Sequence, residues 1–279
     1  MCGIAGSTTA TSDVLQTMGA RLRHRGPDSD GTWQAPGGIL GLAHTRLKVI
    51  DLSDGGHQPM VSDDRRFALV FNGEIYNYKA LRRDLESKGE SFRSDSDTEV
   101  LFVLLRREGK KALARLVGMF SFAFWNGESG ELLLARDRLG IKPLVYAPLA
   151  NRQIAFASEI EALRAHPGID LNIDRQAVSE FLACLYVPQP LCIHKGIRKL
   201  PPGHTLTWRA GTTTIEPYWQ PAFKGTRQPT LDEAVEEILP LVRQSVIDRL
   251  VADVPVGCFL SGGIDSSVIA ALMAEESKA

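Results

Sequence analysis

The chain begins with Met1-Cys2-Gly3-Ile4-Ala5-Gly6, a short apolar segment whose second residue is a cysteine. Removal of Met1 would leave Cys2 with both a thiol and a free α-amine. An α-amine has a pKa of about 7.7–8.0, so its unprotonated fraction could take the thiol proton at neutral pH, directly or through a water. Cys2 is therefore a candidate N-terminal nucleophile. The alternative is a small buried apolar residue in a first strand, and the segment alone does not decide between the two.

The composition is that of an ordinary globular protein. The 279 residues correspond to about two domains of roughly 100–200 residues each. A formal net charge of -1 argues against a dedicated nucleic-acid binder, which usually carries a basic stripe. The four cysteines form neither a CxxC zinc pattern nor a disulfide framework, which favours a reducing compartment. With no signal-like N-terminus and no apolar run near the roughly 20 residues that span a bilayer, we expect a cytoplasmic protein without membrane contact.

The first part of the chain, to about residue 160, predicts a mixture of strands and helices. Helices are expected at 76–88, ending at Gly89, and at 98–107. Many strands before few helices favour antiparallel sheets in layers, an α+β fold, over alternating βαβ units. Short apolar segments bounded by Gly, Asp and Asn predict the strands, at 38–46, 67–72, 119–125, 131–136 and 153–157.

The later part of the chain indicates a domain change. We assign residues 2–190 to a first domain, 191–229 to a junction and 230–279 to a second domain. A helix capped by Asp174 is expected at 174–186, and a hairpin at 205–208 and 213–215. Thr230 and Glu233 form a capping box for a helix that Pro240 should kink or divide. A strand at 254–260, a Gly-rich loop and a helix at 267–275 then resemble the start of a nucleotide-binding α/β domain.

Three further segments carry chemistry, although each has a plain alternative. Arg46, at the end of an apolar strand, could fork onto a carboxylate or form a surface ion pair. Asn72-Gly73 offers a side-chain amide and a backbone N–H for an oxyanion, or forms a simple turn. Asp95 and Asp97 could cap the following helix, or one of them could hold an α-ammonium group.

The order of these motifs is more specific than any one of them. MCGIAG, RHRGPD, HTRLKVID, FNGEIYNY, SDSDTEV, GMFSFAFW and ARDRLGIKPL follow one another as in the class II glutamine amidotransferase domain, in the version found in glutamine-hydrolysing asparagine synthetases. The resemblance covers essentially the whole chain and implies a four-layer α-β-β-α sandwich of the N-terminal nucleophile hydrolase type. It implies that Cys2 is the nucleophile and that Asn72 and Gly73 form the oxyanion hole. The glutamine contacts it implies are Arg46 for the α-carboxylate, Asp97 for the α-ammonium group, and Val49, Ile50, Asn72, Gly73 and the Glu74 main chain.

The segment SGGIDSS (residues 261–267) lacks the lysine of a Walker A loop. Two glycines and a following helix N-terminus can still cradle a phosphate. In its strand-loop-helix context the segment resembles the PP-loop of ATP pyrophosphatases. That resemblance places ATP against Leu260, Ser261, Gly262, Gly263, Asp265, Ser266 and Ser267, with Asp265 also helping to hold Mg²⁺.

For the full-length protein the resemblance implies a coupled reaction. Glutamine supplies ammonia, which amidates ATP-activated aspartate to give asparagine, AMP and pyrophosphate, and homodimers are frequent in the family. The family's synthetase domain continues well beyond Ala279, so this stretch would support glutamine hydrolysis alone. The junction at 187–199 resembles a branch that includes other acceptors, which leaves a sugar acid or peptide carboxylate as an alternative. A β-lactam synthetase-like homologue would lack Cys2, and a non-catalytic module would not need the Arg46, Asn72, Gly73 and Asp97 set.

Overall fold

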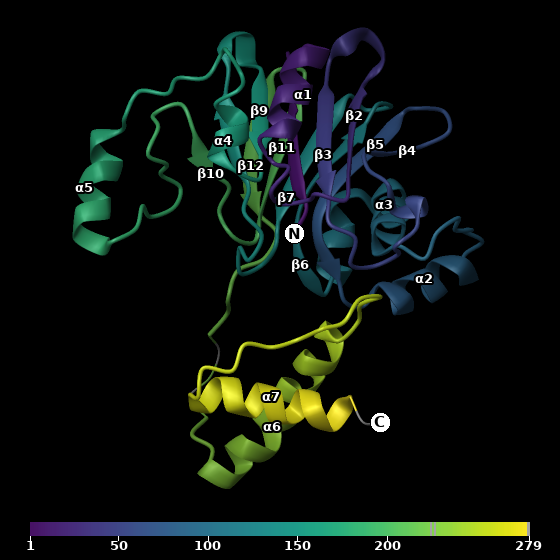
Figure 1. Cartoon of the computed structure of the whole chain (residues 1–279), viewed down its shortest axis with the longest axis vertical. Helices are drawn as coiled ribbons and strands as arrows, with labels where there is room; N and C mark the ends of the chain where they lie inside the picture. The colour runs from purple at the N-terminus through teal and green to yellow at the C-terminus, as the bar shows by residue number, and fades with distance from the viewer. Residues whose placement is uncertain (224, 226, 278–279) are drawn as a thin grey trace. The chain divides into compact units, whose positions relative to one another are not determined.

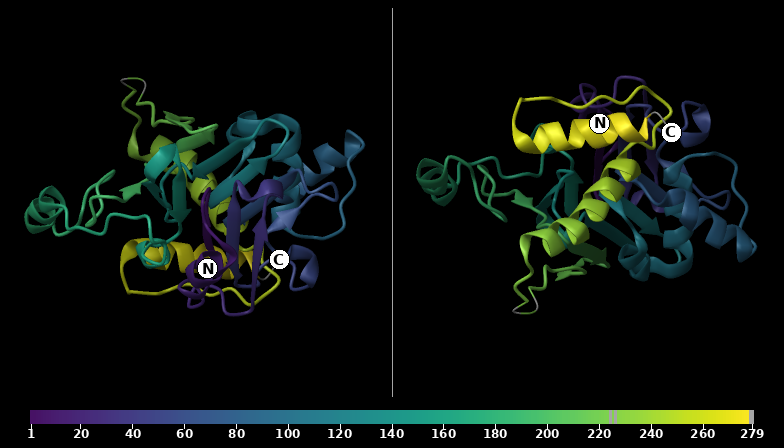
Figure 2. Two further views of the ribbon diagram at one scale, coloured as in Figure 1. Left: turned by 90° about the horizontal axis from the view of Figure 1, so that it is seen from above. Right: turned by 90° about the horizontal axis from the view of Figure 1, so that it is seen from below.

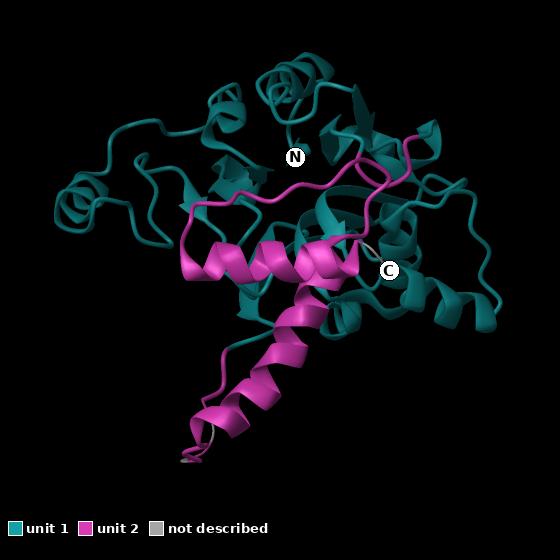
Figure 3. Ribbon diagram, turned by 60° about the horizontal axis from the view of Figure 1, so that its bottom comes forward, with its two compact units in different colours: residues 1–48, 53–220 teal, residues 49–52, 221–279 magenta. Residues whose placement is uncertain are grey.

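A computed structural model describes residues 1–223, 225 and 227–277 of the chain. The chain divides into two units, which Figure 3 colours separately: unit 1 comprises residues 1–48 and 53–220, and unit 2 comprises residues 49–52 and 221–279. Lys224 and Thr226 of the expected junction, and Lys278 and Ala279 of the expected second domain, lie outside the described residues. Among the described residues, no helix combines the length and the apolar composition that crossing a bilayer requires.

Unit 1 is built on two six-stranded sheets in which every strand pair is antiparallel. Sheet A has the order β10-β8-β9-β1-β3-β2, with β1 (Gly3–Ser7), β2 (Ser29–Gln34), β3 (Gly41–Arg46), β8 (Val145–Pro148), β9 (Ile154–Ala157) and β10 (Arg198–Lys199). Sheet B has the order β12-β11-β7-β6-β5-β4, with β4 (Met60–Val61), β5 (Phe67–Ile75), β6 (Gly118–Asn126), β7 (Glu131–Arg136), β11 (His204–Arg209) and β12 (Thr212–Pro217).

The two sheets face each other across one apolar core. Trp33 and Leu42 of sheet A belong to the same buried cluster as Val70, Trp125 and Leu134 of sheet B. Alternate residues of a strand point to opposite faces, so one side of each strand enters this core. Burial of apolar surface, worth roughly 25 cal/mol per Å², holds the sheets together.

Helices cover the outer face of each sheet (Figure 1). On sheet A, Met18 of α1 (Ser12–Ala20) and Leu163 of α4 (Ile160–Leu163) share a second buried cluster with Ala43 of β3. On sheet B, α3 (Asp97–Glu108) packs on β5 and β6, where Phe102 meets Phe124 edge-on with ring centroids 6.2 Å apart, and α2 (Tyr78–Ser87) packs on α3. The four layers are therefore α-β-β-α, as expected from the sequence.

The remaining elements of unit 1 lie outside these layers. Helix α5 (Arg175–Cys184) stands clear of both sheets in every view (Figures 1 and 2). Its N-cap, Asp174, accepts hydrogen bonds from Gln176 N and Ala177 N, as expected from the sequence. Four short 3₁₀ helices lie at Pro36–Gly38, Asp54–Gly56, Gly109–Arg115 and Ala150–Arg152.

Residues 191–229 are more regular than a junction. They contain β10, β11 and β12, and the hairpin β11-β12 extends sheet B because β11 pairs with β7. The boundary between the two units lies after Gln220 instead. The outer strand β12 is exposed throughout, which agrees with its mostly polar composition.

Unit 2 contains α6 (Leu231–Arg249) and α7 (Ile264–Glu276), joined by an extended segment. The Thr230–Glu233 capping box is present, and α6 continues through Pro240 instead of dividing there. Arg243 of α6 pairs with Glu275 and Glu276 of α7. The prediction of a strand at 254–260 is wrong, and this segment has no regular secondary structure. A strand needs a neighbouring strand to bind its backbone N–H and C=O groups, and the described part of unit 2 contains no strand.

Candidate active site

Cys2 lies at the start of β1, beside the end of β3. Gly3 pairs with Thr45 of β3. The Cys2 thiol contacts Leu47, the first residue after β3: Leu47 N donates to Sγ at 3.5 Å, and Sγ lies 3.7 Å from Leu47 O. Burial raises the pKa of the Cys2 thiol, and Asp97 acts in the same direction. The Leu47 hydrogen bond, the N-terminal ammonium group and Arg46 oppose that rise. A nucleophile at this position needs nearby positive charge or a base to ionise.

The motif RHRGPD holds this end of the sheet in place. Arg25 Nε donates to Cys2 O at 2.9 Å, and the Arg25 guanidinium pairs with Glu159. Asp28 Oδ2 accepts from Lys48 N at 2.8 Å, just beyond β3. Gly26 lies so close to β3 that a Cβ would fall 2.4 Å from the Thr45 carbonyl carbon. The motif therefore binds the backbone next to Cys2 and the backbone just beyond β3.

Asn72 of β5 is fully buried, and its amide has no hydrogen-bond partner among the described residues, at either Nδ2 or Oδ1. Residues 68 and 70 of the same strand face sheet A, so by strand alternation Asn72 faces the side on which β1 and β3 lie. A buried amide without a partner costs roughly 1–3 kcal/mol. The Nδ2 and Oδ1 atoms of Asn72 are therefore both available to bind a ligand.

The N–H groups along the open edge of β5 alternate in a way that singles out Gly73. Phe71 N donates to Gln58 Oε1 at 2.6 Å, and Ile75 N donates to Asp97 Oδ2 at 2.9 Å. Gly73 lies between these two residues. Its N–H points to the same edge of the strand as theirs, since the N–H groups of alternate residues share an edge. Within the described part of the chain its N–H has no acceptor. Only glycine fits, because a Cβ would lie 2.2 Å from Met119 O.

Arg46 and Asp97 provide opposite charges in this cluster. Arg46 ends β3, is 4% exposed, and donates from Nη1 to Ser53 O at 2.7 Å. Asp97 opens α3, and the capping role that we considered for it belongs to Ser96, whose side chain accepts from Thr98 N. Both residues interact electrostatically with Cys2. One cation and one anion suit the α-carboxylate and α-ammonium group of an amino acid.

The protonation of Asp97 depends on its surroundings. Burial raises the pKa of Asp97 to about 7, and the neighbouring Glu74 adds to the rise, whereas the Ile75 hydrogen bond opposes it. The group is thus near its titration point at neutral pH.

Sequence reasoning missed Lys142, although it lies in the quoted motif ARDRLGIKPL. Lys142 is 4% exposed, and its backbone is fixed: its N–H donates to Asp137 Oδ2, and its carbonyl accepts from Arg136 Nε, each at 2.9 Å. Burial lowers the pKa of Lys142, which interacts with Glu74 and Cys2. The signal was a lysine placed between a buried turn and an apolar strand, where a solvated charge is not expected.

Val49 and Ile50 belong to unit 2 and are not grouped with the other candidate residues. In that unit Val49 O accepts from Asp253 N at 2.9 Å, and Asp51 N donates to Asp253 Oδ2 at 2.7 Å. Their expected contacts with glutamine stay a prediction.

The candidate nucleotide loop of unit 2 lies at the N-terminus of α7. Gly262 has a φ of 82°, a left-handed conformation that favours glycine, and Gly263 is the N-cap. Ser261 and Ser266 hydroxyls lie 3.0 Å apart, and Ser267 Oγ donates to Gly263 O at 2.8 Å. The loop is exposed, with Leu260 just before it and Asp265 in the first turn of α7, and its expected binding of a phosphate at this helix N-terminus stays a prediction. Among the described residues no group of three or more His, Cys, Asp or Glu could hold a metal ion, so Mg²⁺ at Asp265 stays a prediction.

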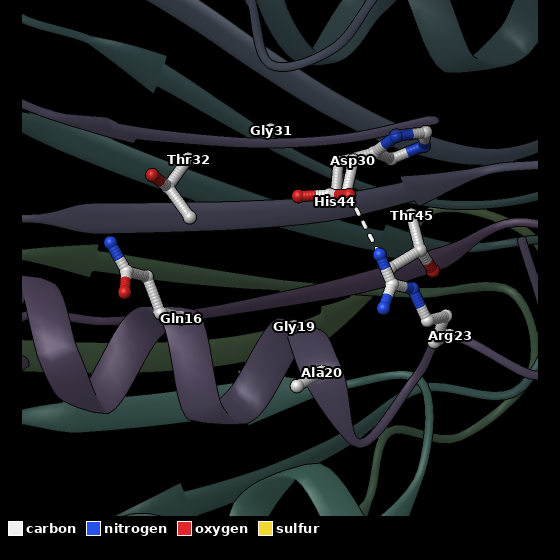
Figure 4. Close-up of a pocket in the computed structure, with 9 residues that line it drawn as sticks. All are labelled: Gln16, Gly19, Ala20, Arg23, Asp30, Gly31, Thr32, His44 and Thr45. Atoms are coloured by element: carbon white, nitrogen blue, oxygen red, sulfur yellow. Dashed lines mark ion pairs between the residues drawn. The ribbon is translucent and has the colours of Figure 1, made fainter. Parts of the chain in front are cut away.

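A separate pocket of about 280 Å³ lies where α1 meets β2 and β3 (Figure 4). Two of its lining residues, Arg23 and Asp30, form an ion pair, with 3.7 Å between Nη2 and Oδ1. Cys2, Asn72 and Asp97 do not line it. This pocket is therefore distinct from the cluster around Cys2.

The candidate nucleophile Cys2, the donors on β5 and the opposite charges of Arg46 and Asp97 suit a class of protein that comparison with known families identifies. The profile of the glutamine amidotransferase domain matches residues 1–219, and the chain belongs to that family. The profile of asparagine synthase matches residues 237–279.

Individual relatives agree with this assignment. The chain is 39% identical, over 99% of its length, to asparagine synthetase [glutamine-hydrolyzing] 1 of Bacillus subtilis, and 34% identical to a putative asparagine synthetase 2 of Methanocaldococcus jannaschii. It spans 44% and 57% of these relatives' lengths. Its fold resembles that of the glutamine phosphoribosylpyrophosphate amidotransferase of B. subtilis, with a TM-score of 0.61 at 19% identity over 99% of this chain and 64% of that one.

Proposed function

We propose that this chain hydrolyses glutamine with Cys2 as the nucleophile. The observation that carries the proposal is the pair of donors on β5, the buried Asn72 amide without a partner in the described structure and the Gly73 N–H beside it. A thiolate that attacks an amide creates an oxyanion, and its stabilisation requires such preorganised donors. Membership in the glutamine amidotransferase domain family supports the same reaction.

The proposed reaction begins once Met1 has been removed. The α-amine of Cys2 takes the thiol proton, and the thiolate attacks the side-chain carbonyl carbon of glutamine. As the C–N bond breaks, the α-ammonium group of Cys2 returns the proton to the leaving nitrogen. Ammonia is released, and a thioester between Cys2 and the glutamyl group remains. A water then attacks the thioester carbon, its proton passes to the Cys2 sulfur, and glutamate leaves.

The neighbouring residues bind and orient the substrate. Arg46 would grip the α-carboxylate and Asp97, in its ionised form, the α-ammonium group. The Glu74 main chain and the carbonyls of Val49 and Ile50 would complete the contacts. Holding glutamine at both ends places its amide carbon at the thiol, which lowers the entropic part of the barrier.

For the complete protein we propose glutamine-dependent asparagine synthesis, since the similar proteins carry that name and residues 237–279 match asparagine synthase. ATP supplies the activation of the aspartate carboxylate that ammonia then attacks, and AMP and pyrophosphate are released. The loop around Gly262, Ser266 and Ser267 would hold the phosphates, with Asp265 near Mg²⁺. A homodimer and a cytoplasmic location are parts of the same proposal.

Glutamate release tests the first step, on protein whose loss of Met1 is verified by mass. We expect Cys2→Ala to lower the rate more than about a thousandfold and Asn72→Ala about 10²–10³-fold, the cost of one oxyanion donor. Cys184→Ala is the matched control, because this cysteine is exposed on α5 and should leave the rate unchanged. Unchanged glutamate release in Cys2→Ala would contradict the nucleophile assignment.

Product analysis tests the second step, on the complete protein. With ATP, Mg²⁺, ammonia and aspartate we expect asparagine and AMP in equal amounts. AMP that forms with another carboxylate and not with aspartate would refute aspartate as the acceptor.

A further inference from the structure

Two side chains hold both backbone groups of Phe71, the residue just before Asn72. His44 Nε2 lies 3.1 Å from Phe71 O, and Gln58 Oε1 accepts from Phe71 N at 2.6 Å. His44 and Gln58 are 1% and 3% exposed. At this point the edge of β5 has no neighbouring strand, because β4 pairs only with Leu69 and Ala68. The two side chains therefore take the place that a strand would fill.

The same side chains connect the other parts of the candidate site. His44 is on β3, two residues before Arg46, and crosses from sheet A to sheet B. Gln58 Nε2 also donates to Thr98 Oγ1 at 3.4 Å, beside Asp97. Because Phe71 O can only accept, His44 must donate from Nε2. Burial lowers the pKa of His44 to about 3, so the ring is a neutral donor at every working pH.

We propose that His44 and Gln58 are positioning residues that fix the oxyanion hole relative to the two residues that bind the ends of glutamine. The inference rests on the proposed glutaminase function. Fixing the N–H and C=O of Phe71 fixes the two peptide groups that flank this residue. It therefore sets the strand edge on which the Gly73 N–H lies two residues later, and the position of Asn72 on the face turned towards β1 and β3. Donors stabilise an oxyanion only when they are held close to the productive geometry, within roughly 0.5 Å.

The first variant is Gln58→Met, which keeps the length of the side chain and removes both hydrogen bonds. We expect kcat for glutamate release to fall about 10–100-fold, part of the cost of one lost donor, while KM changes less than about threefold. The rate of Cys2 alkylation by iodoacetamide, which needs no oxyanion hole, should stay within about twofold of wild type. Gln34→Met is the control, since among the described residues the Gln34 side chain makes one hydrogen bond, to Ala10 O, on the edge strand β2 of sheet A.

Two further variants separate positioning from a general loss of stability. Gln58→Glu retains an oxygen that accepts from Phe71 N. Its kcat should therefore be at least about tenfold higher than that of Gln58→Met. His44→Phe keeps a ring and loses the donor. Its effect on kcat should combine non-additively with that of Gln58→Met, because both side chains bind the backbone of one residue, Phe71. If Gln58→Met does not fold, His44→Phe carries the same test.

The outcomes distinguish this inference from the proposed function. The wild type must first be active. The positioning role is overturned if Gln58→Met or His44→Phe then has the wild-type kcat, calculated per molecule whose Cys2 reacts with iodoacetamide. Equal losses in Gln58→Met and Gln58→Glu also overturn it. A wild-type protein that alkylates at Cys2 but releases no glutamate would instead refute the proposed function.

Discussion

Replacement of Asp97 by asparagine should stabilise the fold and weaken glutamine binding. Asp97 is 4% exposed, and burial raises the pKa of its carboxyl group from 3.8 to about 7. Between these two pH values the folded chain keeps a proton that the unfolded chain has lost. The free energy of unfolding therefore falls as pH rises through this interval, and above pH 7 the full penalty of an ionised buried carboxylate is present.

The magnitude follows from the size of the shift. About three pKa units at 1.36 kcal/mol each amount to about 4 kcal/mol above pH 7 and to about half of that at pH 5.5. Asparagine has the same shape, carries no charge, and can still accept the hydrogen bond from Ile75 N. We therefore expect Asp97→Asn to unfold at higher urea concentration than wild type, by a margin that grows about 2 kcal/mol from pH 5.5 to pH 7 and then stays constant.

Urea titrations followed by tryptophan fluorescence measure this margin, since Trp33, Trp125 and Trp208 lie in the core of unit 1. The same variant should raise the glutamine KM about a hundredfold, because removing one partner of a buried ion pair costs roughly 3 kcal/mol. In wild type KM should fall as pH rises to 7, since only the ionised carboxylate attracts an ammonium group. A pH-independent margin, or a variant less stable than wild type at pH 8, would refute the assignment of a raised pKa to Asp97.

Four other variants test further parts of the structure. Gly73→Ala should lower kcat about a hundredfold and stability by about 1–3 kcal/mol, because its Cβ would lie 2.2 Å from a backbone oxygen of β6. Gly19→Ala, in helix α1 with only an ordinary 3.6 Å contact, should instead stabilise by about 0.5–1 kcal/mol in urea titration. Lys142→Met should shift the pH profile of Cys2 alkylation upward, since a nearby ammonium group favours the thiolate; an unshifted profile would exclude that interaction. Asp174→Ala removes the N-cap of α5 and should speed amide exchange there by the equivalent of about 1 kcal/mol, with no change in the sheets.

The sequence predicted the elements whose apolar content was continuous. Segments 67–72, 119–125 and 131–136 are the central strands β5, β6 and β7, which are nearly all buried. By contrast β2 is polar on its exposed positions and buries only Trp33, so its composition gave no strand signal. The segment 254–260 shows the opposite error, since its apolar content predicted a strand that finds no partner in the described part of unit 2.

The candidate site divides in the same way. Asn72, Gly73 and Asp97 were candidates from motif order, and the structure brings them together, since Asp97 accepts a hydrogen bond from the strand β5 that carries the other two. His44 and Gln58 were not candidates, since their role depends on where β4 stops, and that is decided by pairing and not by local sequence. Lys142 was missed because its place between a turn and an apolar strand is only an indirect sign of burial, whereas the folded chain shows the burial directly.

One strand edge unites these observations. Along β5 the N–H groups of Phe71 and Ile75 are taken by Gln58 and Asp97, whereas the N–H of Gly73 between them has no acceptor among the described residues. The two groups next to that gap, the Asn72 amide and the Asp97 carboxyl, are both unfavourable for folding: the first is buried without a described partner, and the second has a raised pKa. Groups that lower stability in the absence of substrate are those that gain most when substrate arrives. The edge is therefore better explained by binding an amino-acid amide than by stabilising the sheet.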